Sequence, residues 1–164
     1  MKKFLFLFLA FFFFFLVIFQ TSFLNHFSLW GVLPNFILIF LILLNFLENS
    51  RENSGLVLAG FSGFLLDFFS GLQFGVCFLT FIFLALLIKK FLKSLGEENV
   101  VYFALVLIVS LIFYNLVSFA LNSIFKLSFV FYFNLSKFDF FEIAYNLAVG
   151  VAIFGLISYV RKYF

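Results

Sequence analysis

The chain has 164 residues, of which 66% are apolar and 10% are charged, and its formal net charge is +3. Soluble proteins average about 45–50% apolar and about 25% charged residues, and a soluble domain of this length cannot bury so much apolar surface. The composition therefore excludes an ordinary soluble domain, a disordered chain and a nucleic-acid-binding domain.

The long runs in the sequence are apolar at successive positions, which is typical of helices that cross a membrane. The strands of a transmembrane β-barrel would instead alternate apolar and polar side chains. We therefore expect an all-α integral membrane protein, with one transmembrane domain over residues 1–164 and a bundle of about six transmembrane helices. Their approximate ranges are 4–19, 33–47, 55–69, 72–88, 100–121 and 141–160.

The first run, residues 4–19, follows Lys2 and Lys3 and contains no polar side chain. A signal peptide has a similar layout, but no small-x-small cleavage site follows this run, so we expect a retained helix. In the second run Pro34, which precedes Asn35, suits the first turn of a helix. A proline lacks the N–H group that would have no partner at that position.

The second, third and fourth runs are short. Each contains about 15 apolar residues, or roughly 22 Å of helix at 1.5 Å per residue, whereas a hydrocarbon core needs about 20 residues. We favour two full crossings for residues 55–69 and 72–88. A re-entrant hairpin is the alternative, and charge does not separate the two, because both return Lys89 to the side of Arg51.

The basic residues predict the orientation. If six helices cross the membrane, most of the Lys and Arg side chains lie on one side: Lys2, Lys3, Arg51, Lys89, Lys90, Lys93, Arg161 and Lys162. Lys126 and Lys137 lie on the other side. Because cytoplasmic loops carry the excess of basic residues, we expect both termini in the cytoplasm.

Small residues recur at intervals of four in the third run, at Gly55, Ala59 and Gly63. Residues at i and i+4 lie on nearly the same face of a helix, so these three form a smooth stripe. Such a stripe lets a neighbouring helix approach closely. We interpret it as a surface for helix packing and partner binding.

Asp67 extends this stripe by one step and is the only acidic residue inside an expected span. One interpretation is a cap, in which the carboxylate accepts hydrogen bonds from the N–H groups of Ser70 and Gly71. The other is a proton or ion path or a substrate ligand. We favour the cap, because no second ionisable group lies within the spans. Ser70, Gly71 and Gly75 predict a tight turn, since Gly71 can adopt a positive φ.

Residues 126–140 mix aromatic and polar side chains on the expected outer side, including Phe129, Tyr132 and Phe133. They form either an interfacial stretch in the headgroup zone or a docking segment for the extracytoplasmic part of a partner. With one histidine, His26, and one cysteine, Cys77, we expect no metal site and no cofactor. The sequence contains no recognisable nucleophile with a neighbouring base and no paired catalytic carboxylates. We therefore do not expect this chain to be an enzyme.

A motif runs through residues 33–79. Leu33-Pro34-Asn35 opens an apolar helix, Gly60 and Gly63 follow, and the stretch ends in Leu66-Asp67-x-x-Ser70-Gly71-x-x-x-Gly75. This stretch resembles the bacterial rod shape-determining MreD family, whose pattern is a Pro followed by Asp or Asn and a Gly-rich helix that ends in Asp-x-x-Ser-Gly with a later Gly. The chain departs from that family in its high Phe content.

The resemblance implies a non-catalytic, multi-pass subunit of the cell-elongation machinery in the bacterial inner membrane, needed for cell shape and lateral peptidoglycan synthesis. It implies MreC, which has one span and a long extracytoplasmic part, as the main partner within the lipid bilayer. MreB, RodA and a penicillin-binding transpeptidase would belong to the same assembly, and no nucleic acid would take part. The small-residue stripe would then receive the span of the partner.

The layout of six helices also resembles the substrate-binding subunits of energy-coupling-factor vitamin importers. Such a subunit needs polar or aromatic groups that converge on a pocket near the outer face. The residues available for this are few: Trp30, Asp67, Gln73 and Asn115. We keep this function as the alternative.

Overall fold

The computed structural model describes residues 3–23, 34–48, 52–70, 74–92, 99–125 and 140–163. The regular structure in these ranges is helical throughout, which confirms the prediction of an all-α fold for the described residues. In chain order it consists of α1 (Lys3–Ile18), the π-helical turn η1 (Phe19–Phe23), α2 (Phe36–Leu47), α3 (Ser54–Ser70), α4 (Val76–Leu87), the π-helical turn η3 (Ile88–Leu92), α5 (Val100–Phe125) and α6 (Phe140–Tyr163).

Three described helical segments are long and apolar enough to cross a membrane. They are Phe4–Phe23, Val100–Leu121 and Phe141–Arg161, with 20, 22 and 21 residues. A hydrocarbon core about 30 Å thick needs about 20 residues of helix. The first segment exceeds the expected range 4–19 because η1 continues α1 as far as Phe23. These segments support a membrane protein.

The three helices between them are shorter: α2 has 12 residues, α3 has 17 and α4 has 12. At 1.5 Å per residue α2 is about 18 Å long. It begins at Phe36 and not at residue 33, and α4 begins at Val76 and not at residue 72. η3 lengthens α4 through Leu92. Two full crossings and a re-entrant hairpin both remain predictions for α3 and α4.

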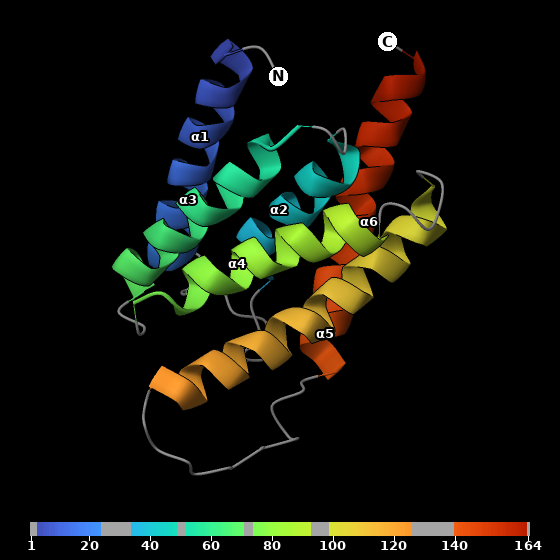
Figure 1. The fold of residues 1–164 in the computed structure, drawn as a ribbon. Coiled ribbons are helices and arrows are strands. Elements are labelled where there is room, and N and C mark those ends of the chain that lie inside the picture. The colour runs from blue at the N-terminus through green and yellow to red at the C-terminus, as the bar shows by residue number, and fades with distance from the viewer. Residues whose placement is uncertain are drawn as a thin grey trace.

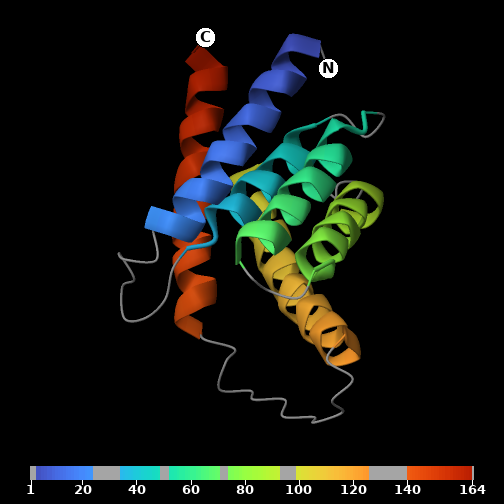
Figure 2. The same cartoon turned by 90° about the vertical axis from the view of Figure 1, so that its left-hand side faces the viewer.

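The start of α1 and the end of α6 lie at the same end of the molecule (Figures 1 and 2). This arrangement fits an even number of crossings. α3 and α4 run antiparallel and make the most extensive contact of any two elements. α1 packs on α3, while α5 contacts both α4 and α6.

The core of the molecule forms around α2. This helix is apolar on every side and buries most of its length, as expected of a helix enclosed by others. Its Phe46 meets Phe103 of α5 and Phe154 of α6 at centroid distances of 5.4 and 5.8 Å, and those two rings stack at 4.4 Å. α1, by contrast, leaves much of its apolar surface exposed.

Candidate functional site

Each of the three short helices begins beside a buried or half-buried polar side chain that accepts hydrogen bonds from its first N–H groups. Asn35 serves α2, Glu48 serves α3 and Asp67 serves α4. The first four N–H groups of a helix have no partner within the helix, and water does not reach them inside a hydrocarbon core. These acceptors therefore let short helices begin within an apolar bundle.

Asn35 is the N-cap of α2. Its Oδ1 accepts hydrogen bonds from the Leu38 N–H (3.0 Å) and from Gln20 Nε2 (3.1 Å), and its own N–H donates to Asn146 Oδ1 (2.8 Å). The cap therefore joins the start of α2 to η1 and to α6. Pro34 precedes the cap, which corrects the expectation that it occupies the first helical turn.

Asp67 is buried and caps α4 rather than its own helix. Its Oδ1 accepts from the Cys77 N–H (2.9 Å), and its Oδ2 accepts from the N–H groups of Gly75 (2.9 Å) and Phe78 (3.1 Å). The donors that we expected were Ser70 and Gly71. Ser70 is the last residue of α3, and Gly71 lies outside the described residues. With three hydrogen bonds, the carboxylate holds α3 to the start of α4.

Among the described residues a positive φ is found at Gly75, whose φ is 99°, whereas Gly71, for which the sequence suggested it, lies outside the described residues. Gly75 is the N-cap position of α4. An L-residue with a side chain resists this backbone conformation. Because the same residue donates its N–H to Asp67, the turn and the carboxylate cap depend on each other.

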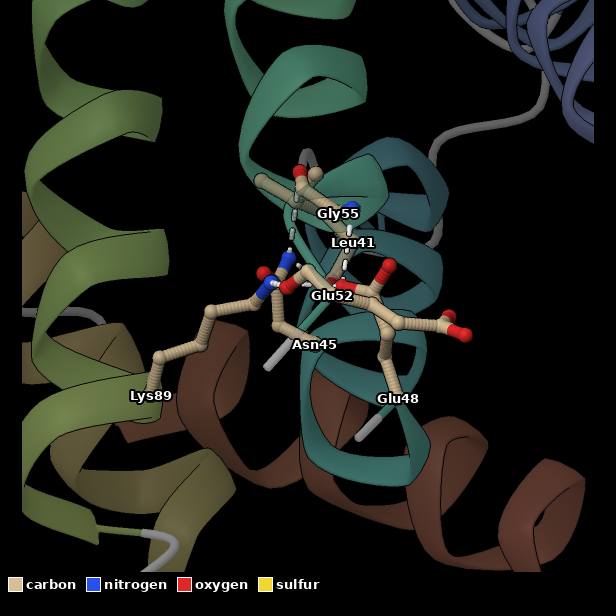
Figure 3. Close-up of polar contacts among 6 residues, drawn as sticks. All are labelled: Leu41, Asn45, Glu48, Glu52, Gly55 and Lys89. Atoms are coloured by element: carbon tan, nitrogen blue, oxygen red, sulfur yellow. Dashed lines mark hydrogen bonds and ion pairs between the residues drawn. The ribbon is translucent and has the colours of Figure 1, made fainter. Parts of the chain in front are cut away.

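Glu48, at the end of α2, and Lys89, in η3, form a buried ion pair (Figure 3). The Lys89 Nζ lies 2.6 Å from Glu48 Oε2, and the two side chains are 8% and 2% exposed. The same carboxylate oxygen accepts from the Gly55 N–H (2.8 Å), and Lys89 also donates to the backbone carbonyl of Glu52. The pair thus ties the end of α2, the start of α3 and η3 together.

The amide of Asn45 closes this cluster on its inner side. Its Nδ2 donates to the carbonyls of Leu41 (2.9 Å) and Gly55 (3.5 Å), and the side chain is fully buried. A β-carbon added at Gly55 would lie 2.5 Å from Asn45 Oδ1 and 2.7 Å from Glu48 Oε2. Only a residue without a side chain therefore fits between the amide and the carboxylate.

The pKa of Glu48 reflects the hydrogen bonds and the ion pair that its carboxylate makes. Burial alone would raise the pKa of the Glu48 carboxyl, but the hydrogen bonds from Lys89 and Gly55 outweigh burial and hold the pKa below its ordinary value. The charged form is therefore the stable form in the folded protein.

Other helices of the same chain pack against the stripe of small residues in α3. A β-carbon added at Gly63 would lie 2.7 Å from both the Cys77 carbonyl oxygen and the Phe78 Cα of α4. Ala59 is fully buried, and Gly55 faces the side chains of α2. The helices that approach the stripe thus come from the same molecule, so the span of a partner needs another surface.

Several residues singled out from the sequence have no described environment. The possible outer docking residues Phe129, Tyr132 and Phe133 lie outside the described residues, as do Trp30 and Gln73. On α6, Ala144, Ala148 and Ala152 also recur at intervals of four, and all three are exposed. Among the described residues no group of three His, Cys, Asp or Glu side chains could hold a metal ion.

Sequence reasoning missed the ion pair. From the sequence, Glu48 is predicted to begin a polar loop, and Lys89 is predicted to be one of the basic residues on the cytoplasmic side. Both positions follow apolar runs, where a charged side chain usually reaches water. The sequence signal for the pair was the shortness of the runs 33–47 and 72–88. Short runs place the charges that follow them closer to the core.

Comparison with known proteins identifies the family. A family model described as rod shape-determining protein MreD matches residues 1–163, essentially the whole chain. The chain belongs to the MreD family. Neither the curated proteins nor the solved structures contain a significant match. Proteins of the MreD family take part in determining rod shape, and the family is not a known family of enzymes.

The MreD motif quoted from the sequence now has a structural meaning in this chain. Asn35 and Asp67 are the acceptors that begin α2 and α4, and Gly75 provides both the positive φ and one of the donors. In this MreD-family chain Asn35, Asp67 and Gly75 therefore stabilise the arrangement of the short helices.

Proposed function

We propose that the chain is a non-catalytic subunit of the bacterial cell-elongation machinery, embedded in the inner membrane and needed for lateral peptidoglycan synthesis. The observation that carries this proposal is the MreD family match over residues 1–163. Three helical segments long enough to cross a membrane support the location.

We propose MreC as the direct partner, with MreB, RodA and a penicillin-binding transpeptidase in the same assembly. Such a subunit works by binding, so it needs a rigid interior and free outer surfaces. The caps at Asn35, Glu48 and Asp67 stabilise the interior. The exposed faces of α1 and α6 supply the outer surfaces. Residues 126–140, with Phe129, Tyr132 and Phe133, are the proposed docking segment for the ectodomain of MreC.

The test is complementation in a rod-shaped bacterium depleted of its own MreD-family protein. Cells that express this chain together with its MreC should stay rod-shaped and incorporate wall precursor along their sides, and MreC should co-purify with the chain from membranes. Cells that become spherical, with no MreC captured, would overturn the proposal. Capture of an energy-coupling ATPase in place of MreC would favour the vitamin-importer alternative.

A further inference from the structure

The outward face of α3 consists of bulky apolar side chains. They recur at helical spacing and so lie on one side of the helix: Val57, Phe61, Phe64 and Phe68. The small residues of α3 face inward, where Gly63 meets the backbone of α4 and Gly55 meets side chains of α2. Helices that associate within lipid approach each other through small residues. A face of bulky side chains therefore suits acyl chains better than a further helix.

This apolar face is shorter than a hydrocarbon core. The apolar part of α3, Ser54–Phe69, is about 24 Å long at 1.5 Å per residue, whereas the hydrocarbon core of a bilayer is about 30 Å thick. The three long segments of α1, α5 and α6 each reach about 30 Å or more by the same measure. In both views α3 runs obliquely to α6 (Figures 1 and 2), which shortens its reach along the axis of α6 further.

Polar side chains end the lipid-facing surface on both helices of the α3–α4 pair. Asn53 is exposed and lies one turn before the first exposed apolar residue of α3. On α4 the exposed apolar side chains Phe83 and Leu86 are followed by the exposed Lys90 in η3. α4 and η3 together, from Val76 to Leu92, extend at most about 26 Å at 1.5 Å per residue. A lysine can reach some way along hydrocarbon to the headgroups, but the short amide side chain of Asn53 cannot.

We propose that the α3–α4 pair crosses the membrane, thins the bilayer beside it and prefers phospholipids with short acyl chains at this face. A span that is shorter than the surrounding hydrocarbon is matched by local thinning of the bilayer, and shorter chains reduce the cost of that thinning. The caps at Glu48 and Asp67 fix where α3 and α4 begin, so the two helices do not lengthen to remove the mismatch. The inference needs a membrane but no protein partner, so it goes beyond the proposed function.

The first test measures which lipids lie beside α3. In a Trp30→Phe background, Phe61→Trp places a fluorescent reporter in the middle of the α3 face, and Leu156→Trp, on α6, is the matched control at an exposed position. The full chain is reconstituted in vesicles of dimyristoleoyl-phosphatidylcholine mixed with brominated dioleoyl-phosphatidylcholine, which quenches tryptophan on contact. We expect the short-chain lipid to displace the quencher about twofold more effectively at Phe61→Trp than at Leu156→Trp.

The second test changes the length of the face. Asn53 lies four residues before Val57, so Asn53→Leu extends the apolar face by about one turn, or about 6 Å. We expect Asn53→Leu, combined with Phe61→Trp, to lose most of the preference for the short-chain lipid. Asn53→Ser keeps a polar side chain at this position and should retain the preference. Thermal unfolding in detergent shows that both variants still fold.

Three results would overturn the inference. One is equal displacement of the quencher at Phe61→Trp and Leu156→Trp, and another is a preference that Asn53→Leu retains in full. The third is a Phe74→Cys side chain, in a Cys77→Ser background, that a membrane-impermeant thiol reagent does not label in intact cells, because a re-entrant hairpin needs no thinning. None of these measurements includes MreC, so each result leaves the proposed function intact. A chain that fails to capture MreC, in turn, leaves this inference intact.

Discussion

Asp67 shows how a single side chain can connect two helices in this molecule. It is 3% exposed and accepts three backbone hydrogen bonds from residues that lie eight to eleven positions further along the chain. Hydrogen bonds to a charged acceptor contribute about 1.5–3 kcal/mol each, and a buried donor left without a partner costs a similar amount. The residue is therefore a strong determinant of the α3–α4 pair.

We predict that Asp67→Asn lowers the free energy of unfolding by about 2 kcal/mol, because the amide has one acceptor oxygen and no charge. Asn99→Ala is the control. It removes an exposed acceptor for the Tyr102 N–H at the start of α5, and such a cap contributes about 1 kcal/mol. Thermal or denaturant unfolding in detergent measures both. Equal stability of Asp67→Asn and the natural sequence would contradict the role of the cap.

Gly63 is the residue that sets the distance between α3 and α4. We predict that Gly63→Ala destabilises the protein by about 1–3 kcal/mol, since its methyl group would meet the backbone of Cys77 and Phe78, which cannot move aside by a side-chain rotation. Gly155→Ala on α6 is the matched control, because nothing lies within 4 Å of its added β-carbon. Unfolding measurements that find the two variants equally stable would show that the close approach is not needed.

At the scale of elements, the ion pair of Glu48 and Lys89, together with its hydrogen bonds to Gly55 and Glu52, links three helical segments. Removing one partner of a buried pair leaves an unpaired charge and costs about 3–5 kcal/mol. We predict that Lys89→Met lowers the free energy of unfolding by that amount, and that the double variant Glu48→Gln/Lys89→Met loses less than the sum of the single variants. A double-mutant cycle measures this coupling, and strictly additive effects would contradict a direct pair.

The lowered pKa of Glu48 predicts how stability depends on pH. Since the folded-state pKa lies below the ordinary value of 4.5, the contribution of this carboxylate is fully present above about pH 4.5. It is lost as the pH falls through the folded-state pKa. As the pH falls below about 4.5, the melting temperature of the natural sequence should therefore drop more than that of Glu48→Gln. Parallel curves for the two proteins would exclude Glu48 as the source.

At the scale of the whole molecule, the start of α1 and the end of α6 lie together. The basic residues predict that this end is cytoplasmic. We expect tags at both termini to be protected from a membrane-impermeant reagent in intact cells and to react after lysis. Reaction of either tag in intact cells would contradict the predicted orientation.

The same membrane-impermeant reagent can test whether α3 and α4 cross the membrane. In a Cys77→Ser background, Phe74→Cys at the turn between these helices should react in intact cells if both helices cross the membrane. A turn that stays unlabelled there, while a cysteine placed in residues 126–139 reacts, would favour the re-entrant hairpin.

The sequence by itself determined the helical membrane class, the positions of the apolar runs and the family. These follow from composition, from continuous apolar runs and from the motif around Asn35 and Asp67, all of which are local properties. α2 and α4 begin later in the structure than the apolar runs predicted, because their starts depend on which side chain caps them.

Only the tertiary structure decided what the motif residues contact. The stripe from Gly55 to Gly63 predicts a close neighbour but does not identify it, and the neighbours are α2 and α4 of the same chain. Glu48 and Lys89 stand far apart in the sequence, so no local pattern predicts that their charges meet in a buried place. Pairing across such distances depends on how the helices pack, and that is a property of the whole fold.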